Sequence, residues 1–132
     1  AFICLAGFMR VLTDGFVERW SGRMINIHPS LLPLYRGTQT HLRALADGVR
    51  VHGCTVHFVV PELDAGPIIA QAVVPVVPDD TEESLAARVT VQEHRLYPRA
   101  LRMICDGTAR LENGRVVFSH GWNADGALHS PG

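Results

Sequence analysis

The chain has 132 residues, of which 47% are hydrophobic and 19% charged, with a formal net charge of −1, so it has the length and composition of one globular domain with a substantial core. The balanced charge argues against an extensive nucleic-acid surface, which usually makes a domain clearly basic. No apolar run approaches the roughly 18 residues of a membrane span, and three widely spaced cysteines predict neither a disulfide framework nor a CxxC metal site, which favours a reducing cytoplasm.

The chain opens on an apolar strand, predicted at residues 2–5 and ending before Gly7. Its apolar character predicts a buried strand with neighbours on both sides. Because the sequence begins directly on this strand, we expect further residues upstream of it in the complete protein. Thr13 is placed to cap a short helix that ends near Trp20, and a second strand is predicted at residues 24–28.

A loop and a helix follow. The Pro-rich segment 29–37 is predicted to be an ordered loop. Residues 40–47 then predict a helix, with Leu42 and Leu45 on its apolar side and Gly48 as its stop signal.

Two antiparallel hairpins are predicted in the second half of the chain. The β-rich runs 55–60 and 68–77 lie on either side of a short turn bounded by Gly and Pro. Residues 111–118 turn through Asn113-Gly114, a strong hairpin signal. The remaining segment, 119–132, is rich in Gly, Ser, His and Pro without apolar periodicity, which predicts a loose C-terminal tail.

A long helix is predicted between these hairpins. Asp80 with Glu83 resembles a capping box at its start, Pro98 is expected to bend it, and Gly107 to end it. Its apolar row recurs at helical spacing at Leu85, Val89, Leu96, Ala100 and Ile104. Alternating strands and helices without an internal repeat indicate a single α/β domain.

Three polar residues form the strongest chemical candidate. Asn26 and His28 lie two residues apart at the end of a predicted strand, so their side chains share one face. Asp64 lies in the turn between the later strands and can reach the same cleft. An amide donor, an imidazole and a carboxylate that favours the imidazolium suit acyl-group transfer.

Each of these residues also has a structural explanation. His28 could be a core histidine with satisfied nitrogens, Asn26 a strand-end amide bonded to backbone, and Asp64 an Asx-type turn residue. The adjacent Pro29 and the Pro-rich loop favour a functional role for His28, since loops at strand ends carry sites.

The other histidines remain open between structure and function. His57 lies within a predicted strand and could be either a buried partner or a site residue, and His41 is a polar residue of a first helical turn. A metal site formed by His28, His41, His52 and His57 is a further alternative, although the sequence has no compact ligand spacing.

Several segments together resemble the formyl-folate transferase family. They are Asn26-Ile27-His28-Pro29-Ser30-Leu31-Leu32-Pro33, Arg36-Gly37, Thr40-His41, 52–59 and 62–71. The Asn-x-His and Leu-Asp-x-Gly pair is specific for the wider family, and Thr40-His41, His57 and 92–94 favour its glycinamide ribonucleotide transformylases, also called phosphoribosylglycinamide formyltransferases. The similarity covers residues 1–118.

The resemblance implies a Rossmann-like formyltransferase fold with a mixed sheet. Residues 1–118 would be the C-terminal portion of the formyltransferase domain, with the folate site and the catalytic residues. The Gly/Ser-rich phosphate loop and the first βα units of the family would lie upstream.

The resemblance also implies an activity and roles for matching residues. The activity is transfer of a formyl group from 10-formyltetrahydrofolate to the amine of glycinamide ribonucleotide in de novo purine biosynthesis, in the cytoplasm and without a metal. Partners would be these small molecules and a second subunit of a homodimer, with neither nucleic acid nor membrane.

The catalytic residues would be Asn26, His28 and Asp64. Folate would be bound by Met9, Arg10, Val11, Leu12, Asn26, Val60, Pro61, Glu62, Leu63 and Asp64. Glu93 would bind the ribonucleotide, while Thr90 replaces a larger polar residue of the family.

Other activities share parts of this motif set. A formyltetrahydrofolate deformylase would use water in place of the amine and is expected to have a regulatory domain upstream. A methionyl-tRNA formyltransferase is expected to add a basic RNA-binding domain after the catalytic one. A non-catalytic folate-binding fragment is the alternative from outside the enzymes.

Overall fold

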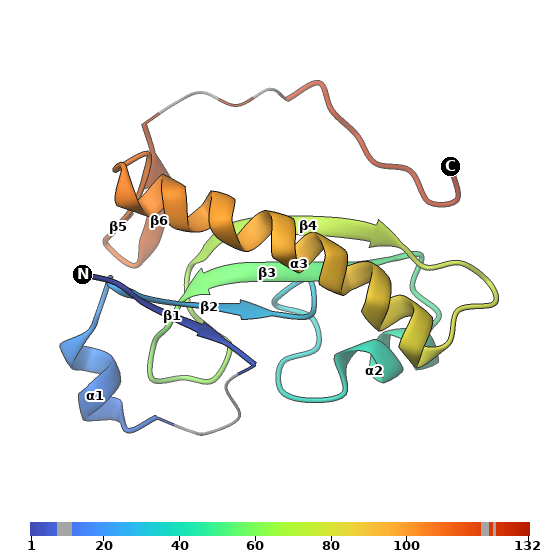
Figure 1. Cartoon of the computed structure of the whole chain (residues 1–132), viewed down its shortest axis with the longest axis horizontal. Helices are drawn as coiled ribbons and strands as arrows, with labels where there is room; N and C mark the ends of the chain where they lie inside the picture. The colour runs from blue at the N-terminus through green and yellow to red at the C-terminus, as the bar shows by residue number, and fades with distance from the viewer. Residues whose placement is uncertain (8–11, 120–121, 123) are drawn as a thin grey trace.

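The computed structural model describes residues 1–7, 12–119, 122 and 124–132. Its elements are β1 (Ile3–Ala6), α1 (Asp14–Arg19), β2 (Met24–His28), α2 (Thr40–Asp47), β3 (Val51–Phe58), β4 (Ile68–Pro75), α3 (Glu82–Cys105), β5 (Ala109–Glu112) and β6 (Arg115–Phe118). Strands β1–β4 form a mixed sheet in that order, and α3 lies across one face of β3 and β4 (Figure 1). The predicted α/β class is therefore confirmed.

The direction of the strands changes within the sheet. β1 and β2 are parallel, whereas β2–β3 and β3–β4 are antiparallel, so the predicted hairpin of the later strands is confirmed. β3 begins at Val51, four residues earlier than predicted, because His52 and Gly53 pair with β4 despite their weak β propensity. A Cβ atom on Gly53 would lie 1.9 Å from the carbonyl oxygen of Ala72, so this close pairing requires glycine.

β1 differs from its prediction as a fully buried strand. It begins at Ile3 and forms an edge of the described sheet, where Cys4 and Ala6 are exposed. The second neighbour expected for it is not found in the described part of the chain. Its inner side is nevertheless fixed, because the hydroxyl of Tyr97 on α3 donates to the carbonyls of Leu5 and Ile25.

The predicted apolar row of α3 is confirmed. Its five members are buried against the sheet, in the hydrophobic core: Leu85, Val89, Leu96, Ala100 and Ile104. The helix continues through Pro98 without a break, and it ends before Gly107, which adopts φ +79° as expected for a helix stop.

The capping box predicted from Asp80 and Glu83 is wrong by one residue. Thr81 is the N-cap and accepts from the Ser84 N–H, while the Ser84 hydroxyl oxygen accepts from the Thr81 N–H. Asp80 instead accepts two hydrogen bonds from the Arg88 guanidinium, which holds the pKa of this carboxyl well below its usual range. The Asp80 carboxylate therefore forms an ion pair with Arg88 in place of the predicted N-cap contact.

The predicted apolar side of α2 is only partly correct. Leu45 packs against the core, whereas Leu42 is 46% exposed. The inward face carries Thr40 and Ala44 instead, and Leu42 lies two residues from each, on the opposite side of the helix. The Thr40 hydroxyl donates to the carbonyl of Pro29 (2.6 Å), so α2 anchors the loop that follows β2.

The C-terminal segment adds a small hairpin. β5 and β6 pair as predicted, with Asn113 and Gly114 at positive φ in the turn. The described residues of the tail, 119, 122 and 124–132, contain no helix or strand. Within the described ranges, no helix combines the length and apolar character that crossing a membrane requires.

Candidate active site

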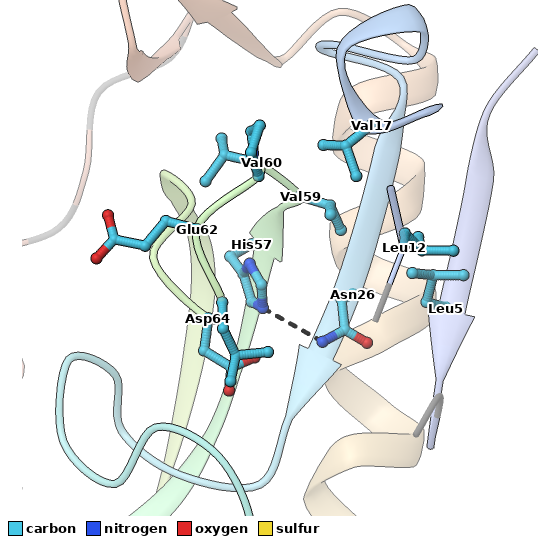
Figure 2. Close-up of a pocket in the computed structure, with 11 residues that line it drawn as sticks. Leu5, Leu12, Val17, Asn26, His57, Val59, Val60, Glu62 and Asp64 are labelled. Atoms are coloured by element: carbon cyan, nitrogen blue, oxygen red, sulfur yellow. Dashed lines mark hydrogen bonds between the residues drawn. The ribbon is translucent and has the colours of Figure 1, made fainter. Parts of the chain in front are cut away.

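Two cavities meet beside the C-terminal end of β2. The larger, of about 570 Å³, lies between that end, the start of α2 and the Glu93 side of α3. The smaller, of about 140 Å³, lies between β1, β2 and the segment 59–64 (Figure 2). Asn26, Leu63 and Asp64 line both cavities. A ligand in either cavity would therefore meet a ligand in the other at these residues.

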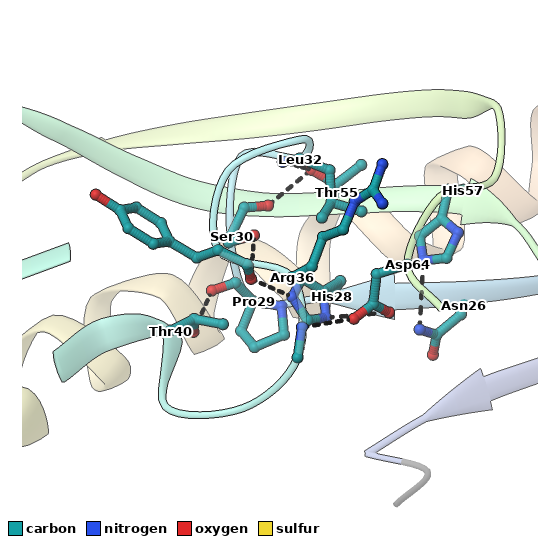
Figure 3. Close-up of polar contacts among 12 residues, drawn as sticks. Asn26, His28, Pro29, Ser30, Leu32, Arg36, Thr40, Thr55, His57 and Asp64 are labelled. Carbon is teal, nitrogen blue, oxygen red and sulfur yellow. Dashed lines mark hydrogen bonds and ion pairs between the residues drawn. The ribbon is translucent and has the colours of Figure 1, made fainter. Parts of the chain in front are cut away.

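His28 lies at this junction with both ring nitrogens beside acceptors. Its Nε2 atom is 2.8 Å from the carbonyl oxygen of Tyr35, to which it donates, and its Nδ1 atom is 3.6 Å from Oδ1 of Asp64 (Figure 3). The imidazolium form has an N–H for each acceptor. Since 3.6 Å is too long for a direct hydrogen bond, the Nδ1–H of that form can donate to a ligand oxygen.

Asp64 adopts an unusual backbone conformation that turns its carboxylate inward. Its φ is +51°, in the left-handed region that aspartate tolerates better than most residues. The side chain is 8% exposed, and its Oδ2 atom accepts a hydrogen bond of 2.8 Å from the N–H of Gly37. The carboxylate therefore connects its own turn to the loop after β2 and leaves Oδ1 facing His28.

Asn26 has a partner on the neighbouring strand. The antiparallel register places it opposite His57, and its Nδ2 atom lies 3.4 Å from Nε2 of that ring (Figure 2). The predicted trio of Asn26, His28 and Asp64 is thus brought together at one place, with His57 beside it.

The loop after β2 is held by buried polar contacts beneath the site (Figure 3). The Thr55 hydroxyl on β3 donates to the carbonyl of Ser30 (2.7 Å) and accepts from the N–H of Leu32 (3.1 Å). The Ser30 hydroxyl contacts the carbonyls of Leu34 (2.5 Å) and Tyr35 (3.3 Å). These contacts fix the carbonyl that receives the Nε2–H of His28.

The described residues among those expected to bind folate line the smaller cavity. Leu12 and Asn26 line it together with the predicted segment 60–64. Met9, Arg10 and Val11 lie outside the described residues. Leu5, Val17 and Val59 complete the apolar wall, and they are indistinguishable from ordinary core residues in the sequence.

Glu93 lines the larger cavity, as expected for a residue that contacts a ligand there. Burial raises the pKa of its carboxyl, and the neighbouring His94 and His28 oppose this rise. Thr90 is exposed and does not line either cavity. Thr40 and His41, which belong to the segments that carry the resemblance, also line the larger cavity. Glu82, Thr38 and Gln39 line it too, although the sequence gives these three no separate signal.

The four histidines considered as metal ligands do not converge. His41 and His52 share a hydrogen bond between Nδ1 and Nε2 (3.1 Å), while His28 and His57 are bonded to separate protein groups. Among the residues that the structure describes, no group of three or more His, Cys, Asp or Glu could hold a metal ion. Burial lowers the pKa of His41, and it lowers that of His52 to about 4.

Some parts of the site could not be assigned from sequence. The Tyr35 carbonyl and the Gly37 N–H are backbone groups, which every residue type carries. His57 is different, because the strand register pairs it with Asn26, and a predicted register for the two strands would have placed them opposite each other.

Proteins with similar sequences include phosphoribosylglycinamide formyltransferases and trifunctional purine biosynthetic proteins. The chain is 50% identical over 129 residues to phosphoribosylglycinamide formyltransferase of Escherichia coli strain K12, which covers 93% of this chain and 61% of that protein. It is 52% identical over 117 residues to the trifunctional purine biosynthetic protein adenosine-3 of Homo sapiens, which covers 88% of this chain and 12% of that protein. The chain therefore spans less than two thirds of the length of each of these relatives.

Solved structures of formyltransferases and of a related hydrolase superpose on this chain. The crystal structure of phosphoribosylglycinamide formyltransferase from Anaplasma phagocytophilum superposes with a TM-score of 0.87 and 46% identity, over 92% of this chain and 60% of that one. A formyltetrahydrofolate deformylase from Pseudomonas syringae gives a TM-score of 0.84 and 32% identity, over 89% of this chain and 39% of that one. A sequence profile described as formyl transferase matches residues 1–101, and this chain belongs to the formyl transferase family.

Proposed function

We propose that the protein carrying this chain transfers the formyl group of 10-formyltetrahydrofolate to the amine of glycinamide ribonucleotide, in de novo purine biosynthesis. The meeting of the two cavities at Asn26 and Asp64, beside His28, carries the proposal. The smaller cavity, with its apolar wall, suits a flat pterin ring, and the larger one offers carboxylates and imidazoles to a ribonucleotide. The formyl donor and the amine would then meet at groups suited to acyl transfer.

Formyl transfer begins with attack of the substrate amine on the formyl carbon. Negative charge develops on the formyl oxygen as this carbon becomes tetrahedral. Asn26 donates to that oxygen from its amide, and His28, which takes part as the imidazolium, donates from Nδ1, since its Nε2–H is engaged by the Tyr35 carbonyl. Each such donor typically stabilises the transition state by about 3 kcal/mol.

The tetrahedral intermediate collapses when the bond between the formyl carbon and N10 of the folate breaks. One proton must leave the attacking amine, and N10 must gain one. Asp64, whose Oδ1 lies 3.6 Å from Nδ1 of His28, is the group that carries this proton, directly or through a water molecule. The Gly37 N–H holds Oδ2, so Oδ1 faces the reacting groups.

The binding roles follow the two cavities. Leu12 and the segment 60–64 hold the folate, through side chains and backbone groups, with Met9, Arg10 and Val11 assigned to the same pocket by resemblance. Glu93 accepts hydrogen bonds from ribose hydroxyls. The reaction as drawn requires no metal.

The wider setting of the protein is also proposed. Residues 1–118 are the C-terminal portion of a formyltransferase domain and 119–132 a loose tail. The enzyme works in the cytoplasm as a homodimer on small-molecule substrates.

One other function has a specific observation in its favour. The likeness to a formyltetrahydrofolate deformylase, at a TM-score of 0.84, supports a hydrolase in which water replaces the amine. Folate binding without turnover is the third outcome that an experiment must distinguish. The higher identity to transferases, 50% against 32%, favours formyl transfer.

One assay separates the three. The full-length protein is mixed with 10-formyltetrahydrofolate, with and without glycinamide ribonucleotide, and both formate and formylated ribonucleotide are followed. A transferase gives formylated product only with the ribonucleotide and releases little formate. Formate released at full rate without the ribonucleotide would identify a hydrolase, and folate binding without either product would identify a binding fragment.

A further inference from the structure

Asn26 and His57 are in contact across two neighbouring strands of the sheet. The two residues face each other across the β2–β3 pair, with Asn26 Nδ2 and His57 Nε2 3.4 Å apart. Asn26 lines both cavities, whereas His57 lines the smaller one and is 2% exposed. A buried ring therefore touches the amide that is proposed to bind the formyl oxygen.

The second ring nitrogen of His57 determines which tautomer is present. Its Nδ1 atom lies 2.9 Å from the carbonyl oxygen of Phe58, which only accepts hydrogen bonds. The hydrogen is therefore on Nδ1, and the neutral ring presents a lone pair at Nε2. Only the NH₂ group of Asn26 can face that lone pair favourably, because its Oδ1 atom would meet it as a second acceptor.

The surroundings of His57 preserve this neutral tautomer. Burial lowers the pKa of the ring. The hydrogen bond to the Phe58 carbonyl and the charge of Asp64 raise it, but by less, so the pKa stays below its usual value. Gly66 closes on the same edge of the ring: a Cβ atom there would lie 1.6 Å from the Phe58 carbonyl oxygen and 3.3 Å from His57 Nδ1. The turn after Asp64 thus leaves the ring little room to rotate.

We propose that His57 is a positioning residue for the Asn26 amide. One N–H of that amide donates to Nε2 of His57, and the other N–H is thereby aimed at the formyl oxygen. An amide that rotated by 180° would present Oδ1 to that oxygen and repel the developing charge. His57 prevents this rotation without contacting the reacting atoms. The role in catalysis rests on the proposed formyl transfer, while the hold on the amide does not.

The hold on the amide is tested by NMR spectroscopy of the full-length protein. Long-range ¹H–¹⁵N correlations at neutral pH should show the Nδ1–H tautomer of His57. The two side-chain amide protons of Asn26 should have well separated shifts, and His57→Phe, which keeps a planar ring without an acceptor, should collapse that separation. An Nε2–H tautomer, or unchanged Asn26 amide shifts in His57→Phe, would overturn the proposal.

The effect on catalysis is tested by a double-mutant cycle on formyl transfer. His57→Phe should lower kcat about tenfold while changing the KM for folate little, and it should lower the kcat of Asn26→Ala no further, because both act through one amide. His57→Gln, whose Oε1 can reach the place of Nε2, should recover most of the turnover. Independent, multiplicative effects of the two substitutions would contradict a role through Asn26.

Val56→Ala is the matched control, because it removes a different buried group from the same strand. Val56 is fully buried on the core side of β3, so its truncation lowers stability without touching Asn26. It should leave the Asn26 amide shifts unchanged. Absence of formyl transfer in the unmodified protein would refute the proposed function, and the tautomer and amide shifts would still decide whether His57 holds Asn26.

Discussion

Asp64 and Gly37 are joined by a hydrogen bond of 2.8 Å from the Gly37 N–H to the Asp64 carboxylate, although 27 residues separate them in sequence. The same carboxylate has its other oxygen 3.6 Å from Nδ1 of His28. One side chain therefore links the two loops that border the site and supplies the negative charge beside the imidazole.

These two tasks of Asp64 can be separated by substitution. Asp64→Asn keeps an oxygen that can accept from Gly37 but removes the charge, whereas Asp64→Ala removes both. Turnover should fall at least a hundredfold in each, because the proton shuttle is lost. Amide hydrogen exchange at Gly37 should quicken only in Asp64→Ala. Equal exchange in the two variants would show that the carboxylate does not anchor the loop.

Glu93 should contribute to ribonucleotide binding alone. Glu93→Ala is expected to weaken the Kd for glycinamide ribonucleotide by about 1–3 kcal/mol, as a buried donor loses its partner. The Kd for formyl folate should barely change, since that ligand is assigned to the other cavity. Isothermal titration calorimetry measures both.

Glu83→Ala is the matched control for Glu93, because it removes an exposed carboxylate from the same helix that lines neither cavity. It should leave both affinities unchanged. An equal loss of ribonucleotide affinity in the two variants would show a general charge effect in place of a contact.

Stability should fall in acid because buried histidines must remain neutral in the fold. Burial, with smaller effects of His41 and His28, lowers the pKa of His52 from 6.5 to about 4. Between these values the unfolded chain binds a proton that the native state does not. The contribution of His52 is therefore complete above pH 6.5 and is lost as pH falls toward 4, on the order of 3 kcal/mol. The lowered pKa of His57 acts in the same direction.

Urea denaturation between pH 7.5 and 4.5 measures this dependence. His52→Gln should unfold at lower urea throughout but with a shallower pH dependence, because one titrating group is gone. Val56→Ala should lower stability equally at each pH. A wild-type slope in His52→Gln would exclude His52 as a source of the acid sensitivity.

Gly66 should tolerate no side chain. A Cβ atom would lie 1.6 Å from the Phe58 carbonyl oxygen, so the turn or the strand must move. Gly66→Ala is expected to cost at least about 2 kcal/mol of unfolding free energy. Gly15→Ala, in open space on α1, should cost nothing and can stabilise by up to about 1 kcal/mol. Thermal unfolding of both variants checks the contrast, and similar melting temperatures would contradict the close packing at Gly66.

The predictable parts of the fold share a local cause. The apolar row of α3 and the Asn113-Gly114 hairpin follow from side-chain periodicity and turn chemistry within a few residues. The start of β3 does not, because His52 and Gly53 are placed in a strand by pairing with β4 rather than by their own propensity. The apolar pattern of α2 places Leu42 on the inward side of the helix, but Thr40 occupies that side and holds the loop through the Pro29 carbonyl.

The candidate site shows the same division. Asn26 and His28 are adjacent by strand geometry, and Asp64 by the length of one turn, so their convergence could be predicted. The contacts that orient them come from the Tyr35 carbonyl, the Gly37 N–H and the His57 ring, each fixed by tertiary structure. Backbone donors and acceptors have no signal in a sequence, and their positions require the fold.

Turnover of His28→Ala is the most direct test of the claim that the formyl group reacts where the two cavities meet. It is measured in the full-length protein with saturating 10-formyltetrahydrofolate and glycinamide ribonucleotide, beside His129→Ala, which removes an exposed histidine of the tail. The loss of one donor to the formyl oxygen predicts a kcat at least a hundredfold lower, on the order of 3 kcal/mol, with folate affinity nearly unchanged and normal turnover in His129→Ala. A folded His28→Ala protein with near-normal turnover would contradict the account and leave His28 a structural role only.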